Sequence, residues 1–266
     1  MSLILTMTNK LLETAISAAR KSGAILKEGF GTNFKIDSKI GRNNLVTDYD
    51  YASEKIIINE IKQIFPSHRF LAEESGDSGY TGDDEITWVI DPLDGTVNFA
   101  HGIPIFSVSI AAVSGSEILC GVVYQPLLDE LFYASRGMGA FLNDKKLNVS
   151  DSNDMKTSLL VTGFPYNVDK NPYDCVGTFV KIVLNGIPIR RLGSAALDLA
   201  YVASGRFDGF WEADLNPWDV AAGVILVEEA GGKVTNYNDE KYSIFDNTIL
   251  TTNGLIHKQI LEVINQ

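Results

Sequence analysis

The chain opens with hydrophobic residues that recur every three to four positions, which is the period of an amphipathic helix. This spacing predicts one helix over 8–30, ended by glycines at 29 and 31, and a second over 52–65, ended by Pro66. Asp50 lies immediately before the second helix, in the position of a capping residue. The polar residues 32–47 carry Lys35, Lys39 and Arg42, and they predict either a hairpin or a mobile loop.

The pattern then changes to short apolar runs separated by turn residues, which is typical of β-strands. Strands are expected at 69–72, 87–90, 106–113, 117–124 and 130–134, with a hairpin turn at 114–116. In the second half, strands are expected at 158–162, 207–211, 233–235 and 249–252, and helices at 173–184, 194–203, 217–230 and from 255 onward. Mixed strands with intervening helices predict a layered α/β or α+β architecture.

Composition and charge mainly argue against certain classes of protein. The 266 residues are 45% hydrophobic and 21% charged, which is ordinary for a folded protein. The net charge of −12 argues against a general nucleic-acid binder, because such proteins need a basic face. No apolar stretch reaches the length of a membrane span, and the start of the chain makes a poor signal peptide. We therefore expect a cytoplasmic protein that does not contact a membrane.

Two cysteines and three histidines are scattered without a recognisable spacing. Cys120 lies in an apolar run, which indicates a small buried side chain, and Cys175 makes no motif with it. The histidines at 68, 101 and 257 do not follow the spacing of a metal-binding helix. A disulfide framework and a histidine-based metal site are therefore not expected.

The segment 88–99, WVIDPLDGTVNF, carries the strongest chemical signal. Its apolar run ends in Asp91 and Asp94, and the hydroxyl of Thr96 follows at once. One interpretation is an ordinary turn, since Pro and Gly favour turns and Asp caps them. The other is a ligand set, since hard divalent cations such as Mg²⁺ need oxygen donors at this density and usually share them with a phosphate. The segment alone leaves both interpretations open.

Further acids lie at predicted strand ends and helix starts, where function collects in α/β proteins. Glu73 and Glu74 follow a strand, Asp50 precedes a helix, and Asp219 lies in the first turn of another. Each has a structural explanation when taken alone; Asp219, for example, would stabilise a helix dipole. Together, converging carboxylates would bind two or three hard cations. The helix starts at 94–96 and 192–195 would offer backbone N–H groups to phosphate, although Ser194 also fits a plain N-cap.

Three linked motifs resemble the inositol monophosphatase family of Mg²⁺-dependent, lithium-sensitive phosphatases. They are Glu73-Glu74-Ser75, the segment 91–99 and the segment 218–223, in the family's order and separation, and the similarity runs over nearly the whole chain. The resemblance implies one domain over 1–266, with an N-terminal half of about 1–150 and a C-terminal half of about 151–266. It implies an α-β-α-β-α sandwich, with the site between the halves, and a homodimer.

The resemblance also implies residue roles. The implied metal ligands, for two or three Mg²⁺ ions, are Glu73, Asp91, the carbonyl of Leu93, Asp94 and Asp219, with Asp91 bridging the first two ions. The implied catalytic residues are Glu73, Thr96 and Asp50, because Thr96, oriented by Asp50, would help Glu73 and the first metal activate a water molecule. The implied substrate contacts are Asp94, Gly95, Thr96, Gly193, Ser194, Ala195, Glu212 and Asp219.

Two positions depart from the family pattern. Val97 stands where many members have a second threonine, and Ala72 stands where glycine is common. Neither is an implied ligand, so we expect activity to survive both. No lysine of the segment 32–47 is assigned a role, because that segment is hard to align.

The expected function is that of a Mg²⁺-dependent phosphomonoesterase acting on inositol monophosphate or related small phosphate esters. Metal-activated water would attack directly, without a covalent intermediate. The alternatives within the superfamily are fructose-1,6-bisphosphate, 3′-phosphoadenosine phosphates and the 2′-phosphate of NADP, alone or in a dual-specificity enzyme. The alternative from another class is a regulatory binding protein with a moonlighting role, for which the acidic charge argues against direct RNA binding.

Overall fold

The computed structural model describes residues 2–39, 44–77 and 85–266, and it contains two main sheets. The large sheet has the strand order β10-β9-β8-β7-β6-β5-β3-β4, and the small sheet has the order β12-β11-β13-β15-β14. The strands of the large sheet are β3 (Arg69–Ala72), β4 (Gly76–Asp77), β5 (Ile86–Asp94), β6 (Ser107–Ser114), β7 (Glu117–Gln125), β8 (Glu130–Ser135), β9 (Gly139–Leu142) and β10 (Lys145–Lys146). Those of the small sheet are β11 (Leu160–Thr162), β12 (Ile189–Arg190), β13 (Gly209–Ala213), β14 (Lys233–Thr235) and β15 (Thr248–Thr252).

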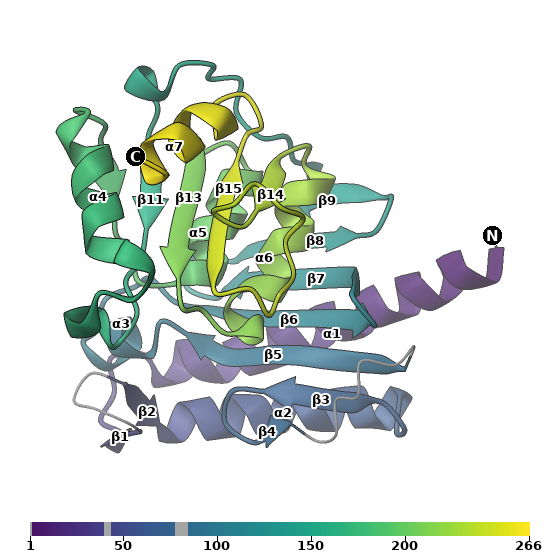
Figure 1. Cartoon of the computed structure of the whole chain (residues 1–266). Coiled ribbons are helices and arrows are strands. Elements are labelled where there is room, and N and C mark those ends of the chain that lie inside the picture. The colour runs from purple at the N-terminus through teal and green to yellow at the C-terminus, as the bar shows by residue number, and fades with distance from the viewer. Residues whose placement is uncertain (1, 40–43, 78–84) are drawn as a thin grey trace.

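The helices form three layers around these sheets (Figure 1). They are α1 (Ser2–Gly29), α2 (Asp48–Ile64), α3 (Thr96–Ala100), α4 (Cys175–Leu184), α5 (Ala195–Ala203), α6 (Pro217–Glu229) and α7 (His257–Ile264), with short 3₁₀ turns at Met155–Thr157, Val168–Lys170 and Pro172–Asp174. One buried cluster joins α1 and α2 to the large sheet, a second joins α5 and α6 to both sheets, and a third joins α4 and α7 to the small sheet. The expected α-β-α-β-α layering is confirmed.

The alternating side chains of the central strands explain why the large sheet is covered on both faces. In β5, Trp88 and Ile90 pack in the cluster of α1 and α2, whereas Val89 between them packs in the cluster of α5 and α6. Successive side chains of a strand point to opposite faces, so an apolar run without polar interruptions fills both layers. The centre of the sheet is therefore buried on both faces, and its strand ends are free to carry polar groups.

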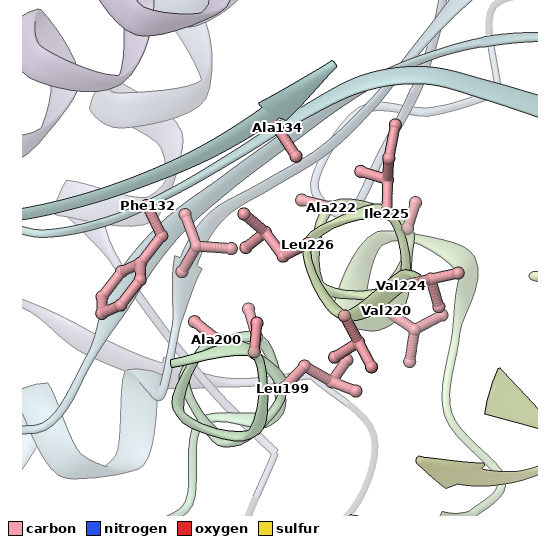
Figure 2. Close-up of a cluster of buried hydrophobic side chains, with 14 of the residues drawn as sticks. Phe132, Ala134, Leu199, Ala200, Val220, Ala222, Val224, Ile225 and Leu226 are labelled. Atoms are coloured by element: carbon pink, nitrogen blue, oxygen red, sulfur yellow. The ribbon is translucent and has the colours of Figure 1, made fainter. Parts of the chain in front are cut away.

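The middle layer is packed closely, because small residues let the backbones approach (Figure 2). Figure 2 shows Ala222, Ile225 and Leu226 of α6 directed toward the large sheet. At Gly121 of β7, an added Cβ would lie 2.8 Å from the Cα of Ala222. At Gly223 it would overlap the side chain of Leu199 in α5. This tight packing holds α5 and α6, and so the residues at their N-termini, at a fixed height above the sheet.

Several element boundaries differ from the sequence-based expectations. The first helix begins at Ser2 rather than Thr8, and the last begins at His257. In the segment 32–47, β1 (Ile36–Ser38) and β2 (Leu45–Thr47) pair as an antiparallel hairpin. Residues 40–43, which include Arg42, lie outside the described residues. Within the described residues, no helix is both long enough and apolar enough to cross a membrane.

The expectation that Asp50 precedes the second helix is wrong. Thr47 is the N-cap of α2, and Asp50 is the third helical residue. The two form a capping box, in which the Asp50 carboxylate accepts from the backbone N–H of Thr47. The sequence T-D-Y-D offers three possible caps, and the reciprocal pair selects the first of them.

Candidate active site

The segment 91–99 forms the centre of a polar cleft at the end of β5. The strand continues to Asp94, but its pairing with β6 shifts register between Asp91 and Asp94. Within this irregularity the backbone N–H of Leu93 donates to Asp91 Oδ1 at 3.0 Å. Gly95 then adopts φ +97°, which glycine tolerates at little cost, and α3 begins at the next residue. The segment is thus a bulged strand end followed by a helical turn.

Strand pairing brings Glu73 to this segment. β3 and β5 run parallel, with Ala72 opposite Ile90, so the residue after each strand emerges at the same edge of the sheet. The backbone N–H of Glu73 donates to the carbonyl of Ile90 at 3.1 Å. Glu73 and Asp91 are therefore neighbours. The pKa of Asp91 agrees with this, because burial first, and then the charge of Glu73, raise that pKa well above its usual value.

The opposite half of the chain contributes Asp219 and Glu212. Asp219 is the third residue of α6, where its Oδ2 accepts from the backbone N–H of Asn216 at 2.7 Å in a second capping box. Glu212 lies in β13 and is 6% exposed. Its place depends on Gly163, where any Cβ would overlap the Glu212 carboxylate. The second half of the chain thus presents two acids to the site, one from β13 and one from the first turn of α6.

Asp94 joins the two halves directly. Its Oδ2 accepts from Ser194 Oγ at 2.7 Å and from the backbone N–H of Ala196 at 2.8 Å. Ser194 is the N-cap of α5, as expected. In this structure the backbone N–H of Ala196 is therefore already paired with the Asp94 carboxylate. A buried carboxylate at a helix N-terminus is favoured by the same partial charges that favour phosphate.

Thr96 and Asp50 form a buried pair beside these acids. Thr96 Oγ1 lies 2.9 Å from both Asp50 Oδ1 and the carbonyl oxygen of Leu93, so its single proton has two acceptors. Asp50 Oδ2 accepts from Thr47 Oγ1 at 2.6 Å and from the Thr47 backbone. Burial raises the pKa of Asp50 to about 6, against the opposing effect of these hydrogen bonds. Both oxygens of Asp50 are thus committed, and the orientation of Thr96 is fixed.

Two adjoining cavities contain the site. The first, of about 290 Å³, is the acidic cavity, lined by Glu73, Asp91, Leu93, Asp94, Gly95, Thr96, Asp219, Lys39, Asn44, Tyr166, Asn216 and Trp218. The second, of about 370 Å³, shares Asp94, Gly95, Thr96, Tyr166, Asn216 and Asp219 and extends to Gly193, Ser194, Ala195, Glu212, Arg191 and Asp198. The structure therefore gathers every residue of the expected metal and substrate sets in one continuous space, and Asp50 lies behind it in contact with Thr96.

The electrostatics of the acidic cavity favour a cation. Burial, followed by neighbouring acids, raises the pKa of Asp91 and Asp219 well above their usual range, and burial raises that of Asp94 to about 6. A buried carboxylate cluster is costly unless positive charge compensates it. Among the described residues, no three acidic, thiol or imidazole groups already form a closed metal site. The all-oxygen donor set nevertheless fits Mg²⁺, which binds through one or two carboxylates and keeps waters and phosphate oxygens as its other ligands.

Lys39 is one of the site residues that the sequence reasoning left unassigned, as are Arg191 and Asp198 in the second cavity. Its Nζ lies 2.9 Å from Glu73 Oε1 and 2.5 Å from Glu74 Oε1. Burial opposes its charge, but Glu73 and Glu74 outweigh burial and raise its pKa above the usual value. Glu74 is largely buried beside it, although the sequence alone allowed it to be a solvated residue. The sequence shows only that Lys39 follows a possible hairpin strand. The fold is needed to show that this hairpin lies beside the acids.

The comparisons with known proteins agree with this geometry. A family model described as "Inositol monophosphatase family" matches residues 7–266. The chain belongs to the inositol monophosphatase family. It is 41% identical to "Nus factor SuhB" of Escherichia coli K12 over 252 residues, covering 94% of each chain. It is 38% identical to "Fructose-1,6-bisphosphatase/inositol-1-monophosphatase" of Thermotoga maritima over 256 residues, covering 96% of each chain.

A solved structure extends the similarity to three dimensions. The inositol monophosphatase from Anabaena superposes with a TM-score of 0.86 at 42% identity, covering 97% of this chain and 96% of that one. The protein is therefore a phosphatase, of a family that is generally metal-dependent and acts on small phosphate esters. The roles assigned to individual residues remain predictions from the resemblance.

Proposed function

We propose that this protein is a Mg²⁺-dependent phosphomonoesterase that hydrolyses inositol monophosphate or a related small phosphate ester by direct attack of water. The observation that supports this most strongly is the convergence of Glu73, Asp91, Asp94 and Asp219 in one cavity beside the Thr96–Asp50 pair. When bound, Mg²⁺ supplies Lewis-acid stabilisation of the phosphoryl oxygens and lowers the pKa of water. Glu73, Asp91, the Leu93 carbonyl, Asp94 and Asp219 would hold two or three such ions.

The chain's own groups would position the reactants. Thr96, fixed by Asp50, would orient the attacking water on one side of the phosphate. Gly95 and Thr96 line both cavities. An added Cβ at Gly95 would lie 3.0 Å from the Ile105 carbonyl oxygen and 3.2 Å from that of Gly193, so the glycine lets these backbones pack closely beside the site. Gly193, Ser194, Ala195 and Glu212 line the second cavity, where the alcohol of the ester would lie. The described residues of the two cavities include no cysteine or histidine, which supports hydrolysis without a covalent intermediate.

Asp94→Asn tests this function. The amide oxygen can still accept from Ser194 and Ala196, so the fold should survive while one negative charge is lost. We expect Mg²⁺-dependent phosphate release from inositol 1-phosphate to fall at least ~100-fold, as for other losses of transition-state charge stabilisation. Asp214→Asn, an exposed change at the rim of the second cavity, is the control and should be nearly silent. Retained turnover in D94N would refute the metal-ligand role.

A bisphosphatase activity is the second candidate, because Arg191 places a positive charge in the second cavity. Arg191 makes no hydrogen bond or ion pair with the described parts of the chain, and its charge acts on Glu212. A second phosphate group on a sugar could reach it, and the Thermotoga maritima relative carries both activities in its name. Phosphate release from a panel of inositol 1-phosphate, fructose 1,6-bisphosphate, 3′-phosphoadenosine phosphate and NADP, with and without Mg²⁺ and Li⁺, would rank these substrates.

We also propose that the protein is a homodimer. Its support is an apolar stripe on α4, where Val176, Val180, Val183 and Leu184 recur on one side and are all exposed. Val180→Lys should lower the molar mass measured by light scattering if this stripe is part of the interface.

The regulatory role suggested by the name of the SuhB relatives is a separate proposal, which capture of partners from a lysate by the D94N variant would test.

A further inference from the structure

Asp198 is a buried acid that the proposed mechanism does not use. It lies in the first turn of α5 and is 1% exposed. Its neighbours Leu197 and Leu199 are part of the apolar cluster between the two sheets, whereas Asp198 lines the second cavity. An acid in the first turn of a helix has a simple structural explanation, because it interacts favourably with the helix dipole. The hydrogen bonding of Asp198 distinguishes that explanation from a binding role.

The Oδ1 atom of Asp198 is buried and has no hydrogen-bond partner among the described residues. In the described part of the chain it is the only carboxyl oxygen in that condition. Buried polar atoms are nearly always paired, since an unpaired one loses its hydration without compensation. A dipole interaction does not require an unpaired oxygen in a side chain that lines a cavity, so the carboxyl group is left for a partner that occupies the cavity.

The surroundings of Asp198 indicate what kind of partner fits. Glu212 and Arg191 line the same cavity and are close enough to act on the charge of Asp198, as Asp94 also is. Burial first, and then Glu212, raise the pKa of Asp198 well above its usual range, while Arg191 acts in the opposite direction. A protonated carboxyl group donates through one oxygen and accepts through the other. A hydroxyl group, which can also donate and accept, matches it better than a second anion does.

We propose that Asp198 is a specificity-determining residue that hydrogen-bonds a hydroxyl of the leaving alcohol. This inference rests on the proposed phosphatase function and adds a substrate contact to that site. The phosphate lies at the acidic cavity, and the second cavity, which continues from Gly95 and Thr96 past Glu212 to Asp198, is the space left for the alcohol. Two acids on its wall would then bind two hydroxyls of one ring.

Two variants separate a binding role from a structural one. Asp198→Asn keeps the size and the capacity to donate and accept, whereas Asp198→Leu keeps the approximate size and removes both. Each is compared on inositol 1-phosphate and on p-nitrophenyl phosphate, whose leaving group has no aliphatic hydroxyls, with Mg²⁺ present. Asp214→Asn is the matched control, because Asp214 lines the same cavity but is exposed and already accepts from Asn167.

We expect D198L to raise KM for inositol 1-phosphate about 3- to 10-fold, the range for one lost neutral hydrogen bond, with kcat nearly unchanged. Its kcat/KM for p-nitrophenyl phosphate should stay within about twofold of the unsubstituted enzyme, and D198N should recover most of the loss. The melting temperature of D198L should be unchanged or higher, because the substitution removes an unpaired buried polar atom. A dipole role would instead lower it.

Equal losses on both substrates, or an unchanged KM for inositol 1-phosphate in D198L, would refute the role of Asp198 and leave the phosphatase function intact. A lower melting temperature in D198L with unchanged selectivity would show that Asp198 acts only through the helix. If the unsubstituted protein released no phosphate from either substrate with Mg²⁺, the proposed function would fail and this inference would fail with it.

Discussion

The Asp50–Thr96 contact gives the sharpest test of how the fold serves the proposed reaction. Asp50 accepts from Thr47 through Oδ2 and from Thr96 through Oδ1, the latter at 2.9 Å. In Asp50→Asn only one end of the side chain can accept. The helix cap needs that acceptor, because the Thr47 N–H has no alternative, so the amide NH₂ group would face Thr96.

This exchange reverses the hydrogen bond at Thr96 while leaving the atoms nearly in place. Thr96 Oγ1 would accept from the introduced amide group and could donate only to the Leu93 carbonyl, 2.9 Å away. The amide group would then occupy one of the two lone pairs of this oxygen, and the proton would turn from Asp50 to Leu93, so Thr96 would orient a water molecule less well. Loss of a group that orients or accepts from the nucleophile costs about 10²- to 10⁴-fold in rate. We expect kcat of D50N to fall about 100-fold or more, with a free energy of unfolding lowered by about 1 kcal/mol.

Two further variants separate catalysis from capping. Thr47→Ala removes the cap hydroxyl, which should lower stability by about 1 kcal/mol and change kcat less than about threefold, because the bond from Thr96 to Asp50 remains. Asp48→Asn changes an exposed acid in the same helical turn and controls for charge. Steady-state phosphate release and denaturant unfolding provide the two measurements. If D50N kept most of its kcat, or if T47A lost as much activity as D50N, the reasoning would be wrong.

Three other outcomes follow from the structure. Gly163→Ala should raise KM for inositol 1-phosphate about tenfold with a smaller change in kcat, because the new methyl group would displace the Glu212 carboxylate; an unaltered KM would exclude Glu212 from substrate binding. Added Mg²⁺ should raise the melting temperature by relieving the repulsion around Asp91, and D94N should reduce that rise in differential scanning fluorimetry. Burial first, and then Lys233, lower the pKa of His257 to about 4. The unfolded chain therefore binds more protons between about pH 4 and 6.5, so the free energy of unfolding should fall by about 1–2 kcal/mol from about pH 8 to pH 5. His257→Gln should remove that part of the slope in urea titrations.

Local signals in the sequence identified most elements correctly, because their causes lie within a few residues. The apolar faces of the helices, the alternation or continuity of the strands and the glycines after α1 and α6 all depend on neighbours along the chain. The same holds for the segment 91–99, whose density of oxygen donors marked the site before any fold was known. The cap of α2 was misplaced because the T-D-Y-D sequence contains several capable residues, and only the reciprocal bond between Thr47 and Asp50 selects one.

Residues far apart in the sequence were placed by the family resemblance alone, and the physical reason for their proximity appears only in the fold. Glu73 reaches Asp91 because β3 and β5 pair in parallel, and Asp219 reaches both because α6 crosses from the second half. No periodicity encodes these pairings, since they depend on which strands and helices become neighbours after collapse.

The sequence by itself determined the layered fold class, the acids and their chemistry. Only the tertiary structure showed that Asp94 accepts from the start of α5 and that Lys39 pairs with Glu73. It also decided that Asp198 faces a cavity. α5 is buried on nearly every side, so its hydrophobic pattern could not show which face meets the site. The rotation of a buried helix such as α5 about its own axis is set by packing against both sheets. That packing depends on residues far away in the sequence.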